Sequence, residues 1–392
     1  MNSTKNTSSN NKQKTVVDLL AREELIDMVP YESARRLFSS AESSALGDAI
    51  WLNANEAPGS GAYQLDSFAV NRYPDFQPTS LLTAYSSYCG QPVENVLATR
   101  GADEGIEFLI RTFCKAYQDS ILICPPTYGM YAISAENHGA GIVKIPLIEK
   151  VDEQGATKKN QLNLSALAEQ VGKVKIIFLC SPGNPTGNLL PHSDIKAVIE
   201  LFKDTAIVVV DEAYIEFSPE QSVMSWLSDV SAKNNEYDNL VVLRTLSKAF
   251  ALAGLRCGFT IANTDIITML SKVIAPYPIS APVAEIASQA LNSAGLAVMT
   301  NRVKSSNILR ADLVQWLSEQ SWCEFVHPCD ANFVLFKTSQ KDFIFQALLA
   351  KNILIRDQSK QVQLENCLRI SIGSESELTL LKKTINAAIN GE

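Results

Sequence analysis

The chain has 392 residues, of which 46% are hydrophobic and 19% charged, and its formal net charge is −8. This length exceeds one ordinary core and predicts two domains. Because acidic and basic residues are interspersed, the sequence lacks the clustered basic residues of a nucleic-acid-binding surface. Its apolar runs are shorter than the roughly 20 residues of a membrane helix. The expected partners are small polar metabolites or another protein, not nucleic acid or a membrane.

Residues 1–14, MNSTKNTSSNNKQK, are polar and lack the apolar core of a secretion signal, which predicts a disordered tail. Residues 15–49 follow as short amphipathic stretches, and we expect this segment to join the smaller of the two domains. The eight cysteines and three histidines are scattered without the spacing of a zinc site or a disulfide framework. We therefore expect no metal, reduced thiols and a cytoplasmic location.

From about residue 50, short apolar runs alternate with stretches of helical periodicity. The runs are VLATRG (96–101), SILICPP (120–126), GIVKIPL (141–147), VKIIFLC (174–180), AIVVVDEAY (206–214) and NLVVLRTLSK (239–248). Strands that alternate with helices predict βαβ units, an α/β fold and a mostly parallel sheet buried on both faces. We expect this large domain to span residues 50–274.

The pattern changes past about residue 275. Long helical stretches are followed by three strand-like segments, VHPCDANFVLF, ILIRD and CLRISIG. These segments predict a smaller α+β domain over residues 275–392.

Ligands of mostly parallel sheets collect at the carboxyl ends of the strands. Lys248 follows the run NLVVLRT and stands in TLSKAFALAGLRCG, which contains Arg256 and no acidic residue. Burial beside another cation lowers the proton affinity of an amine, and a neutral lysine can form a Schiff base with a carbonyl. The alternative is a lysine whose amine reaches solvent, as most do.

Three polar residues follow neighbouring runs. Asp211 ends the apolar run AIVVVD, and a carboxylate buried there needs a cation or hydrogen-bond donors. A protonated pyridine nitrogen would be a suitable partner. The common alternative is an aspartate that caps a helix. Tyr214 lies three residues further on. In SPGNPTG (181–187), Asn184 can donate a hydrogen bond to an oxygen on a ligand ring. Together they can hold a substituted aromatic ring.

Other segments supply a flat surface and an anion site. GADEGIE (101–107) opens a predicted helix, so its free backbone N–H groups can hold a phosphate. Thr245, Ser247 and Arg256 complete this cradle, and Tyr128 in PPTYGMY can stack on an aromatic ring, although a core tyrosine is the alternative. With the amine and the acid described above, these features fit one ligand, pyridoxal 5′-phosphate.

The same segments resemble those of the fold-type I pyridoxal-phosphate aminotransferases, from about residue 15 to the C-terminus. The resemblance is carried by RGADEGIE, CPPTYGMY, SPGNPTG, DEAYIEF and TLSKAFALAGLRCGF, while PYESARR, NRYPD, ILIRD and LRISIG narrow it to the histidinol-phosphate branch of that family. It implies a seven-stranded, mostly parallel sheet between helices, a smaller α+β domain and an obligate homodimer.

The resemblance also implies a role for each cofactor residue. Lys248 carries the cofactor as a Schiff base and transfers protons, and Asp211 pairs with the pyridine nitrogen. Asn184 and Tyr214 bind the ring hydroxyl, and Tyr128 stacks on the ring.

By the same resemblance, the cofactor phosphate is held by parts of two chains. Within one chain it is bound by the main chain at Ala102 and Asp103 and by Thr245, Ser247 and Arg256. Tyr73 of NRYPD reaches the phosphate bound in the neighbouring subunit.

The implied reaction is the transfer of an amino group from L-histidinol phosphate to 2-oxoglutarate in L-histidine biosynthesis. It gives 3-(imidazol-4-yl)-2-oxopropyl phosphate and L-glutamate with ping-pong kinetics. One site must then bind a phosphate monoester and, in the other half-reaction, carboxylates. Arg356 and Arg369 suit both, because a guanidinium can donate two hydrogen bonds to either anion, and Tyr31 and Asn184 are further substrate-binding candidates. For each arginine the alternative is a surface ion pair.

Other functions are compatible with parts of the sequence. An aromatic or broad-specificity aminotransferase, or a pyridoxal-phosphate-dependent decarboxylase of a phosphorylated amino acid, would keep every cofactor residue, and only Tyr31, Arg356 and Arg369 argue against them. A pyridoxal-phosphate-binding regulatory protein would be expected to carry a basic DNA-binding domain, for which residues 1–14 are too short.

Overall fold

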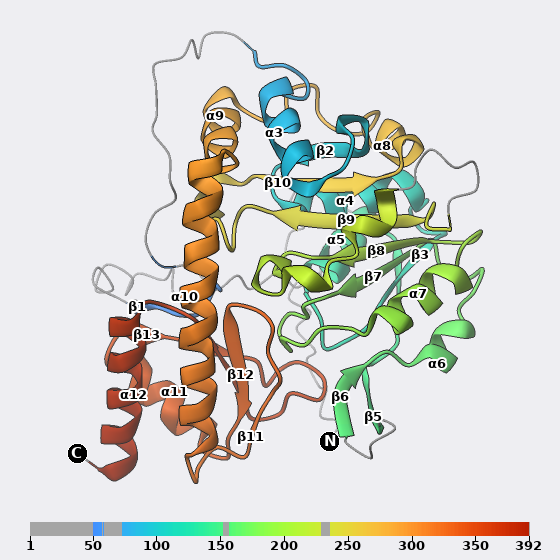
Figure 1. The fold of residues 1–392 in the computed structure, drawn as a ribbon. Coiled ribbons are helices and arrows are strands. Elements are labelled where there is room, and N and C mark those ends of the chain that lie inside the picture. Colours follow the sequence, from blue (N-terminus) through green and yellow to red (C-terminus); the bar gives the residue numbers. More distant parts are fainter. Residues whose placement is uncertain (1–49, 57, 59–72, 152–156, 229–235, 392) are drawn as a thin grey trace, which may run out of the picture.

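The computed structural model describes residues 50–391 except 57, 59–72, 152–156 and 229–235. The tail and the N-terminal segment predicted over 1–14 and 15–49, with Tyr31, lie outside the described residues. Figure 1 shows a large sheet among helices, a smaller sheet beside it and the long helix α10 (Ser293–Ser318), which runs alongside both.

The large sheet has seven strands. Their order is β2 (Val96–Thr99), β10 (Gly258–Ala262), β9 (Leu240–Thr245), β8 (Ile207–Asp211), β7 (Ile176–Cys180), β3 (Ser120–Ile123) and β4 (Gly141–Lys144). Strand β10 is antiparallel to β2 and β9, whereas the other neighbouring strands are parallel. The predicted α/β architecture with a mostly parallel sheet is therefore confirmed.

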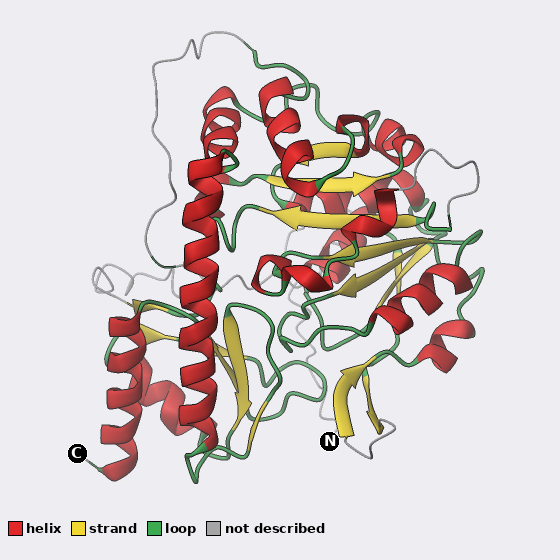
Figure 2. Cartoon of the chain, in the orientation of Figure 1, coloured by secondary structure: helices red, strands yellow, loops and turns green. Residues whose placement is uncertain are grey.

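The central strands are buried on both faces because nearly all their residues are apolar. Along β8, Val208 and Val210 join one hydrophobic core and Val209 joins the opposite one, as the alternation of side chains along a strand requires. Figure 2 shows helices on both sides of these strands. The first core is covered by α3 (Thr79–Cys89), α7 (His192–Leu201) and α9 (Ala281–Ala290), and the second by α4 (Ala102–Phe113), α5 (Met130–His138) and α8 (Thr264–Leu270).

The smaller unit is built on a four-stranded antiparallel sheet. Its strands, in order, are β11 (Phe325–Val326), β12 (Phe333–Lys337), β15 (Cys367–Ser371) and β14 (Arg356–Asp357). Helices α11 (Lys341–Leu349) and α12 (Glu375–Asn390) share one core with this sheet, through residues such as Leu348, Leu381 and Phe336. A parallel pair of β1 (Ile50–Trp51) and β13 (Ile353–Leu354) brings the start of the described chain to this unit.

Helix α10 belongs to both units. Met299 and Val303, in its first half, are buried in a core of the large sheet, whereas Leu313 and Leu317, in its second half, are buried in the core of the smaller sheet. The domain boundary expected near residue 275 stays a prediction. Further elements of the described chain include the antiparallel pair of β5 (Ile148–Val151) and β6 (Thr157–Gln161), the short helix α6 (Leu164–Ala168) and several 3-10 turns. Among the helices of the described residues, none is both long and apolar enough to cross a membrane.

Candidate active site

A cavity of about 300 Å³ opens where the parallel strands of the large sheet end. Its wall comes from the segment after β1, from the ends of β7, β8 and β9, from the loops that follow β2, β3, β7, β8 and β9, and from β14 and β15 of the smaller sheet with the loop after β14. The volume is that of a site for a small molecule. The predicted residues in the wall are Ala102, Asp103, Tyr128, Asn184, Asp211, Tyr214, Thr245, Ser247, Lys248, Arg256, Arg356 and Arg369.

Lys248 enters the cavity from the loop after β9. Its Nζ donates a hydrogen bond to the carbonyl oxygen of Ala54 at 3.3 Å and lies 5.5 Å from the centroid of the Tyr214 ring. Burial and the positive charge of Arg369 lower the pKa of Lys248 from 10.5 to about 8. Part of this amine is therefore neutral near physiological pH, and the neutral amine is the form that attacks a carbonyl.

Asp211 ends β8 and is 3% exposed. Its Oδ2 accepts a hydrogen bond of 2.6 Å from the Tyr131 hydroxyl, and its Oδ1 accepts one of 3.1 Å from the Ala213 N–H. Burial raises the pKa of Asp211 from 3.8 to about 6, although both hydrogen bonds oppose that rise. A cation against this carboxylate would hold it ionised, and a protonated pyridine nitrogen carries the required charge.

The Tyr214 hydroxyl lies between two amides. The Nδ2 atoms of Asn184 and Asn55 donate to it at 3.2 Å and 3.1 Å. Burial raises the pKa of Tyr214, so the phenol keeps its proton at neutral pH. A phenol that accepts two hydrogen bonds can still donate one to a ligand oxygen.

One end of the cavity has the properties of a phosphate cradle. Gly101, at a φ of 80°, precedes α4, and no side chain of the described chain caps the first N–H groups of that helix. A Cβ atom at Gly101 would lie 2.7 Å from Nη2 of Arg256, so glycine lets the guanidinium approach the helix. The same Nη2 is 3.2 Å from the Asp103 carboxylate. The Thr245 and Ser247 hydroxyls, 2.9 Å apart, add further polar groups to this wall.

Two arginines form another part of the wall. Arg356 and Arg369 are direct partners in the antiparallel register of β14 and β15, so their side chains project to the same face. Nη1 of Arg369 donates to Oδ1 of Asn184 at 2.6 Å, and Nη2 donates to the carbonyl oxygen of Asn53 at 3.2 Å. Arg369 is buried, and a pair of guanidinium groups in one wall is suited to an anion with several oxygens.

Pyridoxal phosphate is matched by these groups as they stand in the structure. The amine, the buried acid and the phosphate cradle line one cavity, and glycine at position 101 leaves room beside Arg256 that a Cβ atom would fill. Tyr128, the predicted stacking residue, also lines the cavity, and its hydroxyl donates to Oδ1 of Asp103 at 2.9 Å. The donor set therefore fits this cofactor.

Tyr73 does not line the cavity of its own chain. Its side chain is 81% exposed, and its ring stacks on that of Tyr277 with 4.4 Å between the centroids. Its expected contact with a neighbouring subunit stays a prediction, and Tyr31 lies outside the described residues.

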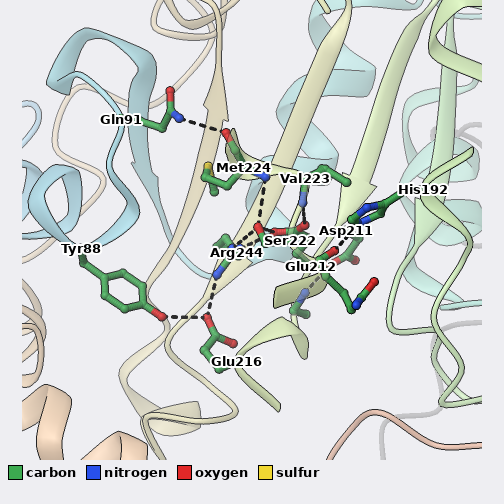
Figure 3. A network of polar contacts seen from close by, with 12 residues as sticks. Tyr88, Gln91, His192, Asp211, Glu212, Glu216, Ser222, Val223, Met224 and Arg244 are labelled. Carbon is green, nitrogen blue, oxygen red and sulfur yellow. Dashed lines mark hydrogen bonds and ion pairs between the residues drawn. The ribbon is translucent and has the colours of Figure 1, made fainter. Parts of the chain in front are cut away.

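Arg244, Glu212 and Glu216 form a buried ionic network, in which Glu212 directly follows Asp211 in the sequence (Figure 3). Nε of Arg244, on β9, donates to Glu212 at 2.7 Å, and Nη1 donates to Glu216 at 3.1 Å. Nη2 donates to the Ser222 hydroxyl at 2.9 Å. Burial alone would lower the pKa of Arg244, but the two carboxylates outweigh it and raise this pKa. Because Glu212 and Glu216 bracket Tyr214 in sequence, the network fixes both ends of its loop.

Three side chains of this region were not assigned roles from the sequence. Asn55 donates to the Tyr214 hydroxyl, and Tyr131 donates to Asp211. Arg244 binds Glu212 and Glu216 and so supports the loop that contains Tyr214. The signal for Arg244 is a charged residue within the apolar run NLVVLRT, together with two acids four positions apart in DEAYIE. Asn55 and Tyr131 make contacts between segments far apart in sequence, which the local pattern does not reveal.

The chain belongs to the family of class I and II aminotransferases, whose model matches residues 44–385. It is similar to curated proteins named histidinol-phosphate aminotransferase. The relative from Colwellia psychrerythraea is 61% identical over 374 residues, which are 94% of this chain and 99% of the relative. The relative from Yersinia enterocolitica is 49% identical over 93% of this chain and 91% of its own length.

Solved structures share the fold. The histidinol-phosphate aminotransferase of Sinorhizobium meliloti, in complex with pyridoxal-5′-phosphate, matches with a TM-score of 0.74 and 22% identity over 94% of this chain and 97% of that chain. The histidinol-phosphate aminotransferase of Clostridium acetobutylicum matches with a TM-score of 0.71 and 23% identity over 82% and 92%. These matches confirm the predicted fold of pyridoxal-phosphate-dependent aminotransferases.

Proposed function

We propose that this protein is a histidinol-phosphate aminotransferase of L-histidine biosynthesis, which uses pyridoxal phosphate. It converts L-histidinol phosphate and 2-oxoglutarate into 3-(imidazol-4-yl)-2-oxopropyl phosphate and L-glutamate. The observation that carries this proposal is that Lys248, the buried acid Asp211 and the guanidinium groups of Arg356 and Arg369 line one cavity. The curated relatives of that name, at 49% and 61% identity, support it.

The residues of the chain divide the work of the reaction. When bound, pyridoxal phosphate supplies an electron sink for the electron pair left by the Cα proton of the substrate. Lys248 accepts that proton, because its lowered pKa provides neutral amine at working pH. Asp211 holds a negative charge in the wall of the cavity, and Asn184 and Tyr214 orient the ring through its oxygen.

Arg356 and Arg369 bind the anionic end of either substrate. Histidinol phosphate has a phosphate monoester and no carboxylate, whereas 2-oxoglutarate has two carboxylates. Guanidinium groups accept either anion through paired hydrogen bonds. The hydrogen bond from Arg369 to Asn184 supports an anion site next to the residues proposed to hold the ring.

Absorption spectroscopy of the purified protein tests the reaction. With pyridoxal phosphate bound to Lys248, we expect a visible band that is lost on addition of L-histidinol phosphate and returns with 2-oxoglutarate. The Lys248→Ala variant should show neither the band nor turnover. A band that responds to glutamate and not to histidinol phosphate would keep the aminotransferase and discard this substrate. A wild-type protein with no band in excess cofactor would overturn the role of Lys248.

We also propose that the protein is a homodimer in which Tyr73 completes the neighbouring site. The support is its exposed position outside its own cavity. Complementation tests this: chains carrying Tyr73→Ala and chains carrying Lys248→Ala are unfolded, mixed and refolded. In a mixed dimer, one site receives an intact Lys248 and an intact Tyr73, so activity should exceed that of either variant alone. If mixing restores no activity, although mixed dimers form, Tyr73 does not act across the interface.

Two further proposals concern location and domain organisation. We propose a cytoplasmic location, which the free state of all eight cysteines supports, because structural disulfides are rare in that compartment. We propose a large cofactor-binding domain over 50–274 and a small domain over 275–392 with the segment 15–49. The separate cores of the two sheets support two units. Limited proteolysis checks the boundary, because cleavage at an internal site away from residue 275 would contradict it.

A further inference from the structure

Tyr131, on α5, touches two of the residues that would hold the cofactor ring, Asp211 and Tyr128. Its hydroxyl donates to Oδ2 of Asp211 at 2.6 Å. Its ring meets the ring of Tyr128 edge-on, with 5.6 Å between the centroids and 88° between the planes. Tyr131 itself does not line the cavity. Its hydroxyl also contacts Cys180, which lines the cavity. Tyr131 therefore acts on a bound ring through its neighbours in the cavity wall.

The position of Tyr131 is fixed by packing. Its side chain is fully buried, and its ring stacks on Phe178 of β7 with 4.6 Å between the centroids and 10° between the planes. A ring held on two sides cannot turn its hydroxyl away from Asp211 without opening the core. The hydrogen bond is therefore built into the fold, independently of what occupies the cavity.

Asp211 needs such a donor because its surroundings disfavour a negative charge. The carboxylate is 3% exposed, and the ionisable groups that face it include Asp103 from α4, Cys180 from β7 and Glu212 and Tyr214 from the loop after β8. Burial raises its pKa to about 6, and the hydrogen bonds from Tyr131 and Ala213 limit that rise. The described wall of the cavity carries four cations, Lys248, Arg256, Arg356 and Arg369.

We propose that Tyr131 is a positioning residue, whose hydroxyl keeps Asp211 ionised and aimed at the cavity and thereby sets the pH range in which the protein binds its pyridine cofactor. The inference rests on the proposed function, since it takes Asp211 as the partner of the pyridine nitrogen. It predicts that loss of one oxygen atom at a residue outside the cavity changes the pH dependence of cofactor binding.

The test measures the association constant of pyridoxal phosphate with the cofactor-free, full-length protein by equilibrium dialysis between pH 5 and pH 8.5. In Tyr131→Phe, the decline of this constant on the acid side should move upward by about one pH unit, because a hydrogen bond to a charged group is lost. At pH 6.5, midway between a midpoint near 6 and one near 7, the variant should bind about threefold more weakly, and at pH 5 about tenfold more weakly. The cofactor's own titrations are common to both proteins and cancel in the comparison.

Two controls separate this effect from structural damage. Tyr85→Phe removes another buried hydroxyl, at a tyrosine that stacks on Phe259 and does not line the cavity, and should leave the profile unchanged. The second control is 1-deazapyridoxal phosphate, in which carbon replaces the ring nitrogen. Its binding should not distinguish Tyr131→Phe from the wild type, because it has no nitrogen to pair with Asp211.

The outcomes are distinct. A Tyr131→Phe profile that matches the wild type overturns the inference, as does an equal loss of affinity for both ligands at every pH. If Tyr131→Phe does not fold, Asp211→Asn provides the second measurement, since the inference requires it to abolish the acid-side midpoint. If the wild type binds pyridoxal phosphate no better than the deaza analogue, the pairing of Asp211 with the ring nitrogen fails and this inference fails with it, whereas failure of the proposed function is detected separately, by a visible band that does not respond to L-histidinol phosphate.

Discussion

Replacing Lys248 by methionine should stabilise the cofactor-free protein while it abolishes catalysis. The ammonium of Lys248 is held near Arg369 in a cavity that excludes much of the solvent, and its pKa falls from 10.5 to about 8. A base with a lowered pKa in the folded state binds its proton more tightly in the unfolded state. The charge on Lys248 therefore opposes folding at neutral pH.

The size of this effect follows from the pKa shift. A shift of about 2.5 units corresponds to about 3 kcal/mol of unfolding free energy. The full cost applies below pH 8 and disappears as the pH rises from 8 to 10.5, where the unfolded chain still binds the proton and the folded one does not. Methionine also loses the hydrogen bond to Ala54, worth about 1 kcal/mol, so we expect a net gain of about 2 kcal/mol at pH 7.

Urea unfolding of the cofactor-free protein at pH 7 and pH 10 measures this gain. Lys248→Met should be more stable than the wild type at pH 7, and the difference should shrink or change sign at pH 10. Lys173→Met, at an exposed lysine, is the matched control and should change stability by less than about 0.5 kcal/mol. A variant no more stable than the wild type at pH 7, or equally stabilised at both pH values, would refute the reasoning.

Three other substitutions test separate parts of the site. Asp211→Ala should fold and lose about 100-fold or more in kcat, since it removes the partner of the ring nitrogen; a near-normal rate would place that partner elsewhere. Arg369→Ala should raise KM for both histidinol phosphate and 2-oxoglutarate by about tenfold or more, and an effect on one substrate alone would contradict a shared anion site. Arg244→Met leaves Glu212 and Glu216 buried without their cation and should cost about 3–5 kcal/mol in urea unfolding, whereas a loss below about 1 kcal/mol would show that the network does not support its loop.

Much of the large sheet could be predicted because its signals are local. Strands β7, β8 and β9 are apolar on both faces, and each was marked by a continuous apolar run that ends in a polar loop. Strand β10 was not among the predicted runs. Its place depends on antiparallel pairing with β2, a strand more than a hundred residues earlier in the chain, and such pairing leaves no mark within GFTIA itself.

The residues of the site likewise divide into those that local sequence signals predicted and those that depend on contacts between distant segments. Lys248 and Asp211 lie at or just past strand ends, so strand prediction alone placed them at one edge of the sheet. The meeting of Arg356 and Arg369 depends on the register of β14 and β15, which the sequence does not specify. Tyr131 reads as a core tyrosine in CPPTYGMY, and only the packing of α5 against β7 directs its hydroxyl to Asp211.

Helix α10 limits how the two units can move relative to each other. A helix of 26 residues is about 39 Å long, and each half of α10 is embedded in a different core. Rotation of the smaller unit relative to the large one must therefore bend α10. The pair Ser305–Ser306 lies between the halves of α10 that are buried in the two cores. We expect α10 to bend at this pair, because serine pairs are among the sites at which helices kink. One turn earlier, Nη1 of Arg302 donates to the carbonyl oxygen of Ala249, the residue next to Lys248, so this hydrogen bond links α10 to the backbone beside the reacting lysine.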